Sequence, residues 1–218
     1  MAMTNHGVAG FEFGKAWRAA RMEGYFSPVF EDVYAAYAGP GRHYHNIMHI
    51  LDSLAEFEEV RQMSSQPGIM ALALFLHDYV HTPDSRDGRD EKESAQKLYE
   101  LVKKSHSDET AGYARDIVLV TVHSPSLVPK NIDEQLMCDI DLAVLGRPAV
   151  IFDNYERLIW EEYKGTYPED GFRRGRARLL DSLDKRSPIY FTEHFRQKYE
   201  DMAHENLKRS IRNLSQSI

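Results

Sequence analysis

An apolar stretch in the middle of the chain constrains its fold more than any other feature. Residues 69–80 are apolar on nearly every side of a helical projection, with His77 and Asp78 as the exceptions. Such an even distribution predicts a helix that is buried on all sides rather than a surface helix. The stretch is shorter than the roughly 20 apolar residues that span a bilayer, so we expect it inside a folded domain.

The two polar side chains in this stretch need partners. An ionised Asp78 left unpaired beside Leu74 and Phe75 would cost on the order of several kcal/mol. A divalent metal ion shared with His77 is one solution, because neutral imidazole and carboxylate are both good ligands for such ions. Pairing with an arginine or with helix-end amides is the other solution, and the dipeptide alone does not decide between them.

Composition limits the classes of function. The 218 residues, 42% of them hydrophobic, suffice for one sizeable core, and a single domain is expected. A net charge of −7 argues against duplex nucleic acid as a partner, whereas a metal ion could still attract a small phosphorylated substrate. The lone cysteine, Cys138, excludes an intrachain disulfide and a cysteine zinc cluster. Residues 1–14 lack the pattern of a secretory signal, so we expect a cytoplasmic protein that has no membrane partner.

Helical spacing of apolar residues recurs along the rest of the chain, and no segment alternates convincingly with the period of a strand. We therefore predict an all-α fold. His45 and His49 are four residues apart at the start of a helix that runs to about residue 62, so they are expected on one face. Arg42 precedes them, where it could contact a phosphate or remain a solvated loop arginine.

A polar loop, residues 82–89, follows the apolar stretch and leads into another predicted helix. Asp90 as N-cap with Glu93 three residues later predicts a capping box. Glu91 then falls in the first turn, where the helix dipole favours a carboxylate. Its alternative role is to face a metal site and orient a water.

Two later segments also carry charged residues of interest. In the predicted helix 132–145, Asp141 lies on the apolar face, whereas Asp139 is expected at the edge or in solvent because it points roughly the opposite way. Residues 172–183 form a predicted basic helix that includes Arg174 and Arg176.

Four blocks of the chain, taken in order, resemble a known family. They are Arg42-x-Tyr44-His45-Asn46-x-x-His49-Ile50, Phe75-x-His77-Asp78-x-Val80, Glu91-x-x-Ser94-Ala95 and Asp139-x-Asp141-Leu142-x-x-Leu145-Gly146. This order is similar to that of the HD superfamily, in its branch of predicted metal-dependent HD phosphohydrolases. The resemblance runs from about residue 42 through most of the remaining chain. It implies a single-domain HD-type helical bundle over 1–218, with a metal-site core at about 42–146 and a C-terminal helical extension at about 149–218.

The resemblance implies a metal-dependent phosphohydrolase that uses metal-activated water to cleave a small phosphate ester, with a nucleotide as the first candidate. The divalent ion could be Mn, Mg, Co, Ni, Fe or Zn, and a homodimer is an open option. The implied metal ligands are His49, His77, Asp78 and Asp141. The implied catalytic residues are Asp78 and Glu91. The residues expected to bind substrate are Arg42, His45, Arg174 and Arg176.

The chain departs from that branch at two positions. Trp160 stands where an arginine is expected, and His81 stands where an aromatic residue is usual. Two alternative functions remain open. A di-iron oxygenase of the HD fold would need further ligands, for which His45, His81 and His123 are the spare candidates. A catalytically silent module that binds metal or nucleotide is the other, although a decayed site should have lost one of its ligands.

Overall fold

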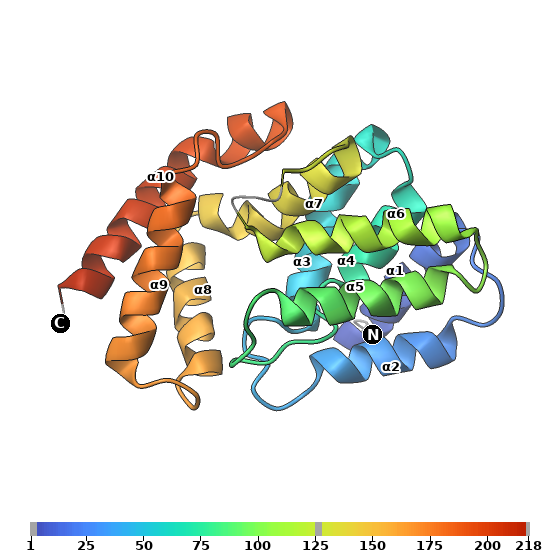
Figure 1. Ribbon diagram of the computed structural model, residues 1–218, viewed down its shortest axis with the longest axis horizontal. Coiled ribbons are helices and arrows are strands. Elements are labelled where there is room, and N and C mark those ends of the chain that lie inside the picture. The colour runs from blue at the N-terminus through green and yellow to red at the C-terminus, as the bar shows by residue number, and fades with distance from the viewer. Residues whose placement is uncertain (1–3, 125–127, 217–218) are drawn as a thin grey trace. The chain divides into compact units, whose positions relative to one another are not determined.

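The computed structural model describes residues 4–124 and 128–216. Within these ranges the chain forms ten α-helices and three short 3-10 helices, without any strand, which confirms the predicted all-α fold (Figure 1). No helix in the described ranges combines the length and the apolar composition that crossing a membrane requires. The chain divides into two compact units, Met1–Ile140 and Asp141–Ile218, and each is described by itself.

The first unit is built around one central helix. Its elements are α1 (Asn5–Ala19), α2 (Ser27–Tyr37), α3 (Ile47–Val60), η1 (Arg61–Met63), α4 (Pro67–Leu76), α5 (Arg89–Val102), α6 (Asp108–Leu119), η2 (Val120–Val122) and all but the last residue of α7 (Ile132–Asp141). Helix α4 contacts α1, α3, α5 and α6 (Figure 1). Every residue from Gly68 to Leu76 is buried. The prediction of a helix buried on all sides is thus confirmed.

A close approach between two segments explains the glycine at the start of α4. A Cβ atom on Gly68 would lie 2.2 Å from the backbone nitrogen of Ala20 and 2.4 Å from the carbonyl carbon of Ala19. These are backbone atoms, which cannot move aside as a flexible side chain can. Gly68 therefore allows the end of α1 to pass directly against α4.

Helix α4 ends earlier than the apolar pattern predicts. Its last residue is Leu76, with His77 as C-cap, so Asp78 lies in the following turn and the prediction of a helix to residue 80 is wrong. The amide of Tyr79 donates to the carbonyl of Leu76 at 3.2 Å, which closes a turn instead of extending the helix. The carbonyls of Asp78 and Tyr79 accept hydrogen bonds from Arg42, so a side chain replaces the helical amides that would otherwise satisfy them.

The start of α5 also differs from its prediction. The N-cap is Gly88, with φ of 66° and no side-chain cap, so the capping box of Asp90 and Glu93 is wrong. The carboxylate of Asp90 accepts instead from the backbone amide of Thr82 at 2.5 Å and from its hydroxyl at 2.9 Å. Asp90 thereby ties the loop after α4 to the first turn of α5.

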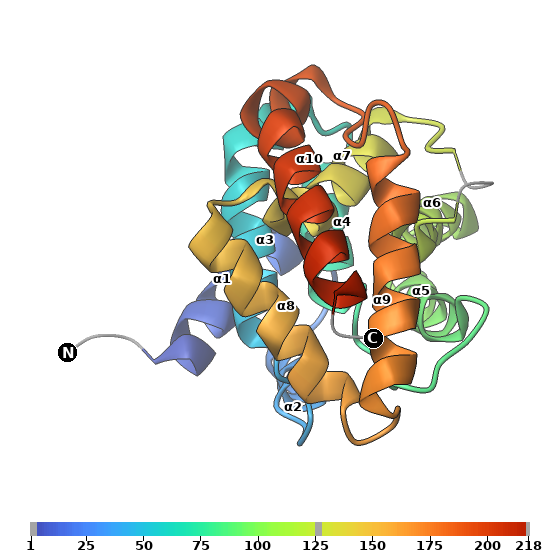
Figure 2. The same cartoon turned by 90° about the vertical axis from the view of Figure 1, so that its left-hand side faces the viewer.

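The second unit contains η3 (Leu142–Gly146), α8 (Ala149–Tyr163), α9 (Glu169–Asp184) and α10 (Glu193–Ser215), and the predicted extension from about 149 lies within it. Figure 2 shows α8, α9 and α10. Asn206 of α10 donates to the carbonyls of Leu145 and Arg147, both at 2.8 Å. Tyr190 donates to the carbonyl of Leu142 at 3.0 Å. These bonds satisfy carbonyls in and just after η3 that the short helix leaves without helical amides.

Candidate metal centre

Three side chains converge inside the first unit. His49 extends from α3, His77 is the C-cap of α4, and Asp78 follows it in the turn. The Nε2 atoms of the two histidines are 3.1 Å apart, and Asp78 Oδ2 lies 3.0 Å from His77 Nε2 and 3.5 Å from His49 Nε2. Both histidines are buried, and the Asp78 side chain is 18% exposed. We call these three residues the HHD cluster.

The tautomer of His77 follows from its second nitrogen. His77 Nδ1 lies 2.9 Å from the carbonyl oxygen of Leu74, which can only accept a hydrogen bond. Nδ1 therefore carries the proton, and in the neutral ring Nε2 keeps its lone pair. Metal-ligating histidines commonly donate their other N–H to a backbone carbonyl in this way, which fixes the ring orientation. The helix end that supplies the Leu74 carbonyl thus aims His77 Nε2 at Asp78 and His49.

The arrangement fits a metal ion. Ligand atoms about 2.1 Å from one ion lie roughly 3.0 to 3.4 Å apart at octahedral or tetrahedral angles, and the separations in the HHD cluster match this spacing. Asp78 Oδ2 is buried and has no hydrogen-bond partner among the described residues. A lone pair on His77 Nε2 facing an ionised carboxylate is unfavourable unless a cation lies between them. The HHD cluster is a group of ligand atoms that could hold such a cation.

Without a metal, the histidines themselves can supply the compensating charge. Burial by itself would raise the pKa of the Asp78 carboxyl, but positive charge on His77, and then on His45, outweighs that effect. The pKa of Asp78 consequently lies well below its usual range. Asp78 therefore remains ionised at neutral pH, as a metal ligand must be.

Arg42 holds the backbone beside the HHD cluster. Its Nη1 donates to the carbonyls of His45 and Asp78 at 3.0 and 2.7 Å, and its Nη2 donates to the carbonyl of Tyr79 at 2.9 Å. The guanidinium also lies 5.2 Å from the centre of the Tyr37 ring. Sequence reasoning missed this role, because two of the three carbonyls belong to residues 36 and 37 positions along the chain from Arg42. A phosphate contact by Arg42 stays a prediction.

Two more histidines lie next to the HHD cluster. His45 precedes α3, whose N-cap is Asn46, so it is not on the helix as the spacing predicts. Its ring centre is nevertheless 6.0 Å from that of His49 and 4.3 Å from that of His81. His81 follows the turn after α4 rather than ending a helix. His45 is thus a neighbour of the HHD cluster, and its contact with substrate stays a prediction.

Glu91 is a second carboxylate, and the charge of Asp78 in the HHD cluster acts on it. It lies in the first turn of α5 and is half-buried. Burial is the main reason that its pKa is raised, and the negative charge of Asp78 raises it further. His123, which follows η2 with φ of 51°, acts in the opposite direction. The charges of Asp78 and His123 therefore both act on Glu91, and a carboxylate with a raised pKa is suited to accept a proton.

The remaining predicted residues belong to the second unit. Asp141 is its first residue, and its role as a fourth ligand stays a prediction. Asp139, in the first unit, is 1% exposed, so its predicted place at the solvent edge is wrong; α7 buries residues on more than one face. Arg176 is buried and donates to Glu156 and Tyr155, whereas Arg174 is exposed. The substrate contacts of both arginines stay predictions.

Comparison with known proteins finds no relative of this chain. Among family models, curated proteins and solved structures, none matches the chain. The resemblance to the HD superfamily accordingly stays a prediction that rests on the four motif blocks. The chemistry of the candidate site rests on the geometry of the HHD cluster.

Proposed function

We propose that this chain is a metal-dependent phosphohydrolase that acts on a small phosphate ester, with a nucleotide as the first substrate class to test. The observation that carries the proposal is the convergence of His49 Nε2, His77 Nε2 and Asp78 Oδ2 at the spacing of ligands around one divalent ion. The resemblance of the motif order to the HD superfamily supports the same activity. By that resemblance Asp141 supplies the fourth ligand.

The residues of the first unit have distinct roles in this proposal. A divalent ion, when bound, lowers the pKa of a water ligand and withdraws charge from a phosphate. His49, His77 and Asp78 would hold the ion, and the Leu74 carbonyl keeps His77 in the ligating tautomer. Glu91 would accept the proton of the attacking water, because its raised pKa makes it a stronger base than an ordinary glutamate.

The proposal is tested by metal content and phosphate release on the same purified protein. Metal content is measured by mass spectrometry, and phosphate release is screened over a nucleotide panel with Mn, Mg, Co, Ni, Fe and Zn added in turn. We expect release that requires a metal and falls by at least about 10³-fold in the near-isosteric Asp78→Asn variant. Asp116→Asn, which changes a surface carboxylate on α6, is the matched control and should retain activity.

Each alternative has its own outcome in this experiment. Bound metal without release from any substrate would favour a silent binding module. Iron content with oxygen uptake would favour the di-iron oxygenase. An Asp78→Asn variant that kept both metal and hydrolysis would falsify the proposal. Loss of metal from Asp141→Ala would support Asp141 as the fourth ligand.

A further inference from the structure

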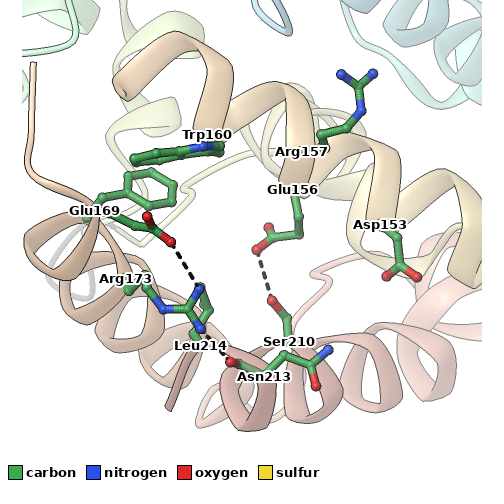
Figure 3. A pocket seen from close by; sticks show the side chains of 10 residues that line it. Asp153, Glu156, Arg157, Trp160, Glu169, Arg173, Ser210, Asn213 and Leu214 are labelled. Atoms are coloured by element: carbon green, nitrogen blue, oxygen red, sulfur yellow. Dashed lines mark hydrogen bonds and ion pairs between the residues drawn. The ribbon is translucent and has the colours of Figure 1, made fainter. Parts of the chain in front are cut away.

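The second unit contains a pocket of its own, separate in sequence from the HHD cluster. Its volume is about 330 Å³, which is within the range of small-molecule sites. Helices α8, α9 and α10 all contribute to its lining. Figure 3 shows Trp160 at one end, Glu156 and Ser210 facing each other across the middle, and Arg173 beside Leu214. Every lining residue lies between 153 and 214, within the second unit.

One wall of this pocket is aromatic. Trp160 and Phe172 have ring centres 4.9 Å apart and planes inclined by 52°. Trp160 is only partly buried, and its indole N–H has no hydrogen-bond acceptor among residues 4–124 and 128–216. Leu214 adds an apolar surface. A flat ring could stack on this wall, and the indole N–H remains able to donate to a ligand.

Arg173 provides a cation with unused donors. Its side chain is 18% exposed, and Nη2 donates to the carbonyl of Asn213 at 2.7 Å. Its ion pair with Glu169 is long, at 3.8 Å, and Glu169 is 67% exposed. Arg173 Nε is buried with no hydrogen-bond partner among the described residues. A guanidinium has five N–H donors, and the single bond to Asn213 leaves donors on Nη1 and Nη2 for a ligand.

The carboxylates that line the pocket are largely neutralised. Glu156 accepts from Arg176 at 2.5 Å through Oε1 and from Ser210 at 2.9 Å through Oε2. Asp153 pairs with Arg209 at 2.6 Å. Arg157, an exposed cation, also lines the pocket. The lining itself carries three carboxylates and two guanidinium groups. Arg176 and Arg209 lie outside the lining and neutralise Glu156 and Asp153, which leaves Arg173 and Arg157 beside Glu169 as the remaining charges. This balance favours a ligand with a negative charge.

We propose that the pocket between α8, α9 and α10 binds a small planar aromatic carboxylate, with the ring on Trp160 and Phe172 and the carboxylate on Arg173. The ring surface and the guanidinium border one small pocket, so a single small molecule can reach both. Guanidinium and carboxylate form the strongest class of hydrogen bonds between side chain and ligand. This site is independent of the proposed hydrolase activity, because none of its residues belongs to the HHD cluster.

The test uses the full chain and three fluorinated probes of one shape. Fluorine NMR line broadening measures the binding of para-fluorobenzoate, of the neutral para-fluorobenzamide and of the cationic para-fluorobenzylamine. We expect saturable binding of the benzoate with a dissociation constant at or below about 1 mM, and binding of the other two at least about tenfold weaker. Equal or tighter binding of the amide or the amine would overturn the proposal, as would no saturation by the benzoate.

Variants locate the site. Arg173→Gln and Trp160→Leu should each weaken benzoate binding by about tenfold, and Arg173→Lys should restore part of the loss because it keeps the charge. Arg178→Gln removes the same charge from an exposed position of α9 outside the pocket and should bind as the natural chain does. Circular dichroism melting identifies variants that remain folded. Equal weakening by Arg178→Gln, or unchanged binding by folded Arg173→Gln, would contradict the assignment.

Discussion

At the residue scale, His77 illustrates how a backbone carbonyl determines what a side chain can bind. The hydrogen bond from Nδ1 to the Leu74 carbonyl leaves the Nε2 lone pair facing Asp78 and His49. The same ring elsewhere on α4 would find its local carbonyls engaged by helical amides. The end of the helix at Leu76 therefore contributes to the geometry of the HHD cluster as directly as the histidine does.

Arg42 leads to a prediction that separates positioning from substrate binding. Arg42→Gln should lower the free energy of unfolding by about 2 kcal/mol, because three carbonyls lose a charged donor. It should also weaken metal binding, because one of the three carbonyls belongs to Asp78, whose side chain is a proposed ligand. Urea unfolding and metal titration measure the two effects. Arg115→Gln changes an arginine on α6 whose side chain is 43% exposed; it is the control and should change stability by less than about 0.5 kcal/mol. Unaltered stability and metal affinity in Arg42→Gln would show that the three hydrogen bonds of Arg42 are dispensable.

Glu91 leads to a prediction with opposite signs for stability and activity. The pKa of Glu91 is raised in the folded protein, so ionisation of its carboxyl opposes folding. The protonated carboxyl contributes its full stability below its ordinary pKa. That contribution is lost as the pH rises through the raised pKa. Glu91→Gln should therefore stabilise the metal-free protein at pH 8, and the gain should shrink as pH falls toward 4.5. Metal-dependent hydrolysis should drop by about 10² to 10⁴-fold. Urea midpoints across this pH range and initial rates measure both; a variant that was less stable at pH 8 than the natural chain would contradict this sign.

At the element scale, the first turn of α4 packs against the backbone at the end of α1, and this contact leaves no room for a side chain at Gly68. Gly68→Ala should destabilise the protein by about 3 kcal/mol, because the new methyl group would meet backbone atoms of Ala19 and Ala20. Gly112→Ala in α6 is the matched control, since a Cβ there meets nothing within 4 Å. It should stabilise by about 0.5 to 1 kcal/mol, as alanine is the better helix former. Thermal or urea unfolding of the two variants gives the comparison. Equal changes in stability would show that the close approach does not restrict position 68 to glycine.

The boundaries of elements were harder to predict than their existence. The apolar run in α4 predicted a buried helix because periodicity is a local property of the chain. The end at Leu76 instead depends on Arg42, and the start of α5 depends on Thr82 pairing with Asp90. Both are contacts between separate segments, for which spacing along the sequence carries no signal. The misjudged burial of Asp139 has the same origin, because a single-face projection ignores neighbours on other faces.

At the scale of the whole molecule, a bound metal should stabilise the fold. A divalent ion that occupies the HHD cluster binds only the folded chain, so at a concentration of 100 times its dissociation constant it should add about 2.7 kcal/mol. Urea unfolding with added ion, then with excess chelator, measures the gain and its reversal. Asp78→Asn should lose the gain, whereas the natural chain and Asp116→Asn should show it equally. A gain that Asp78→Asn retained would place the bound ion elsewhere.

By itself, the sequence determined the helical class, the buried central helix and the residue types able to ligate a metal, because these follow from local periodicity and side-chain chemistry. Tertiary structure decided which of those residues meet. It brought His49, His77 and Asp78 within 3.5 Å of one another across 28 residues of chain, and it engaged Arg42 and Arg176 with groups in the protein. It also created the pocket of the second unit, whose lining from three helices follows no sequence motif. Convergence of distant segments depends on packing, and packing depends on the whole chain at once.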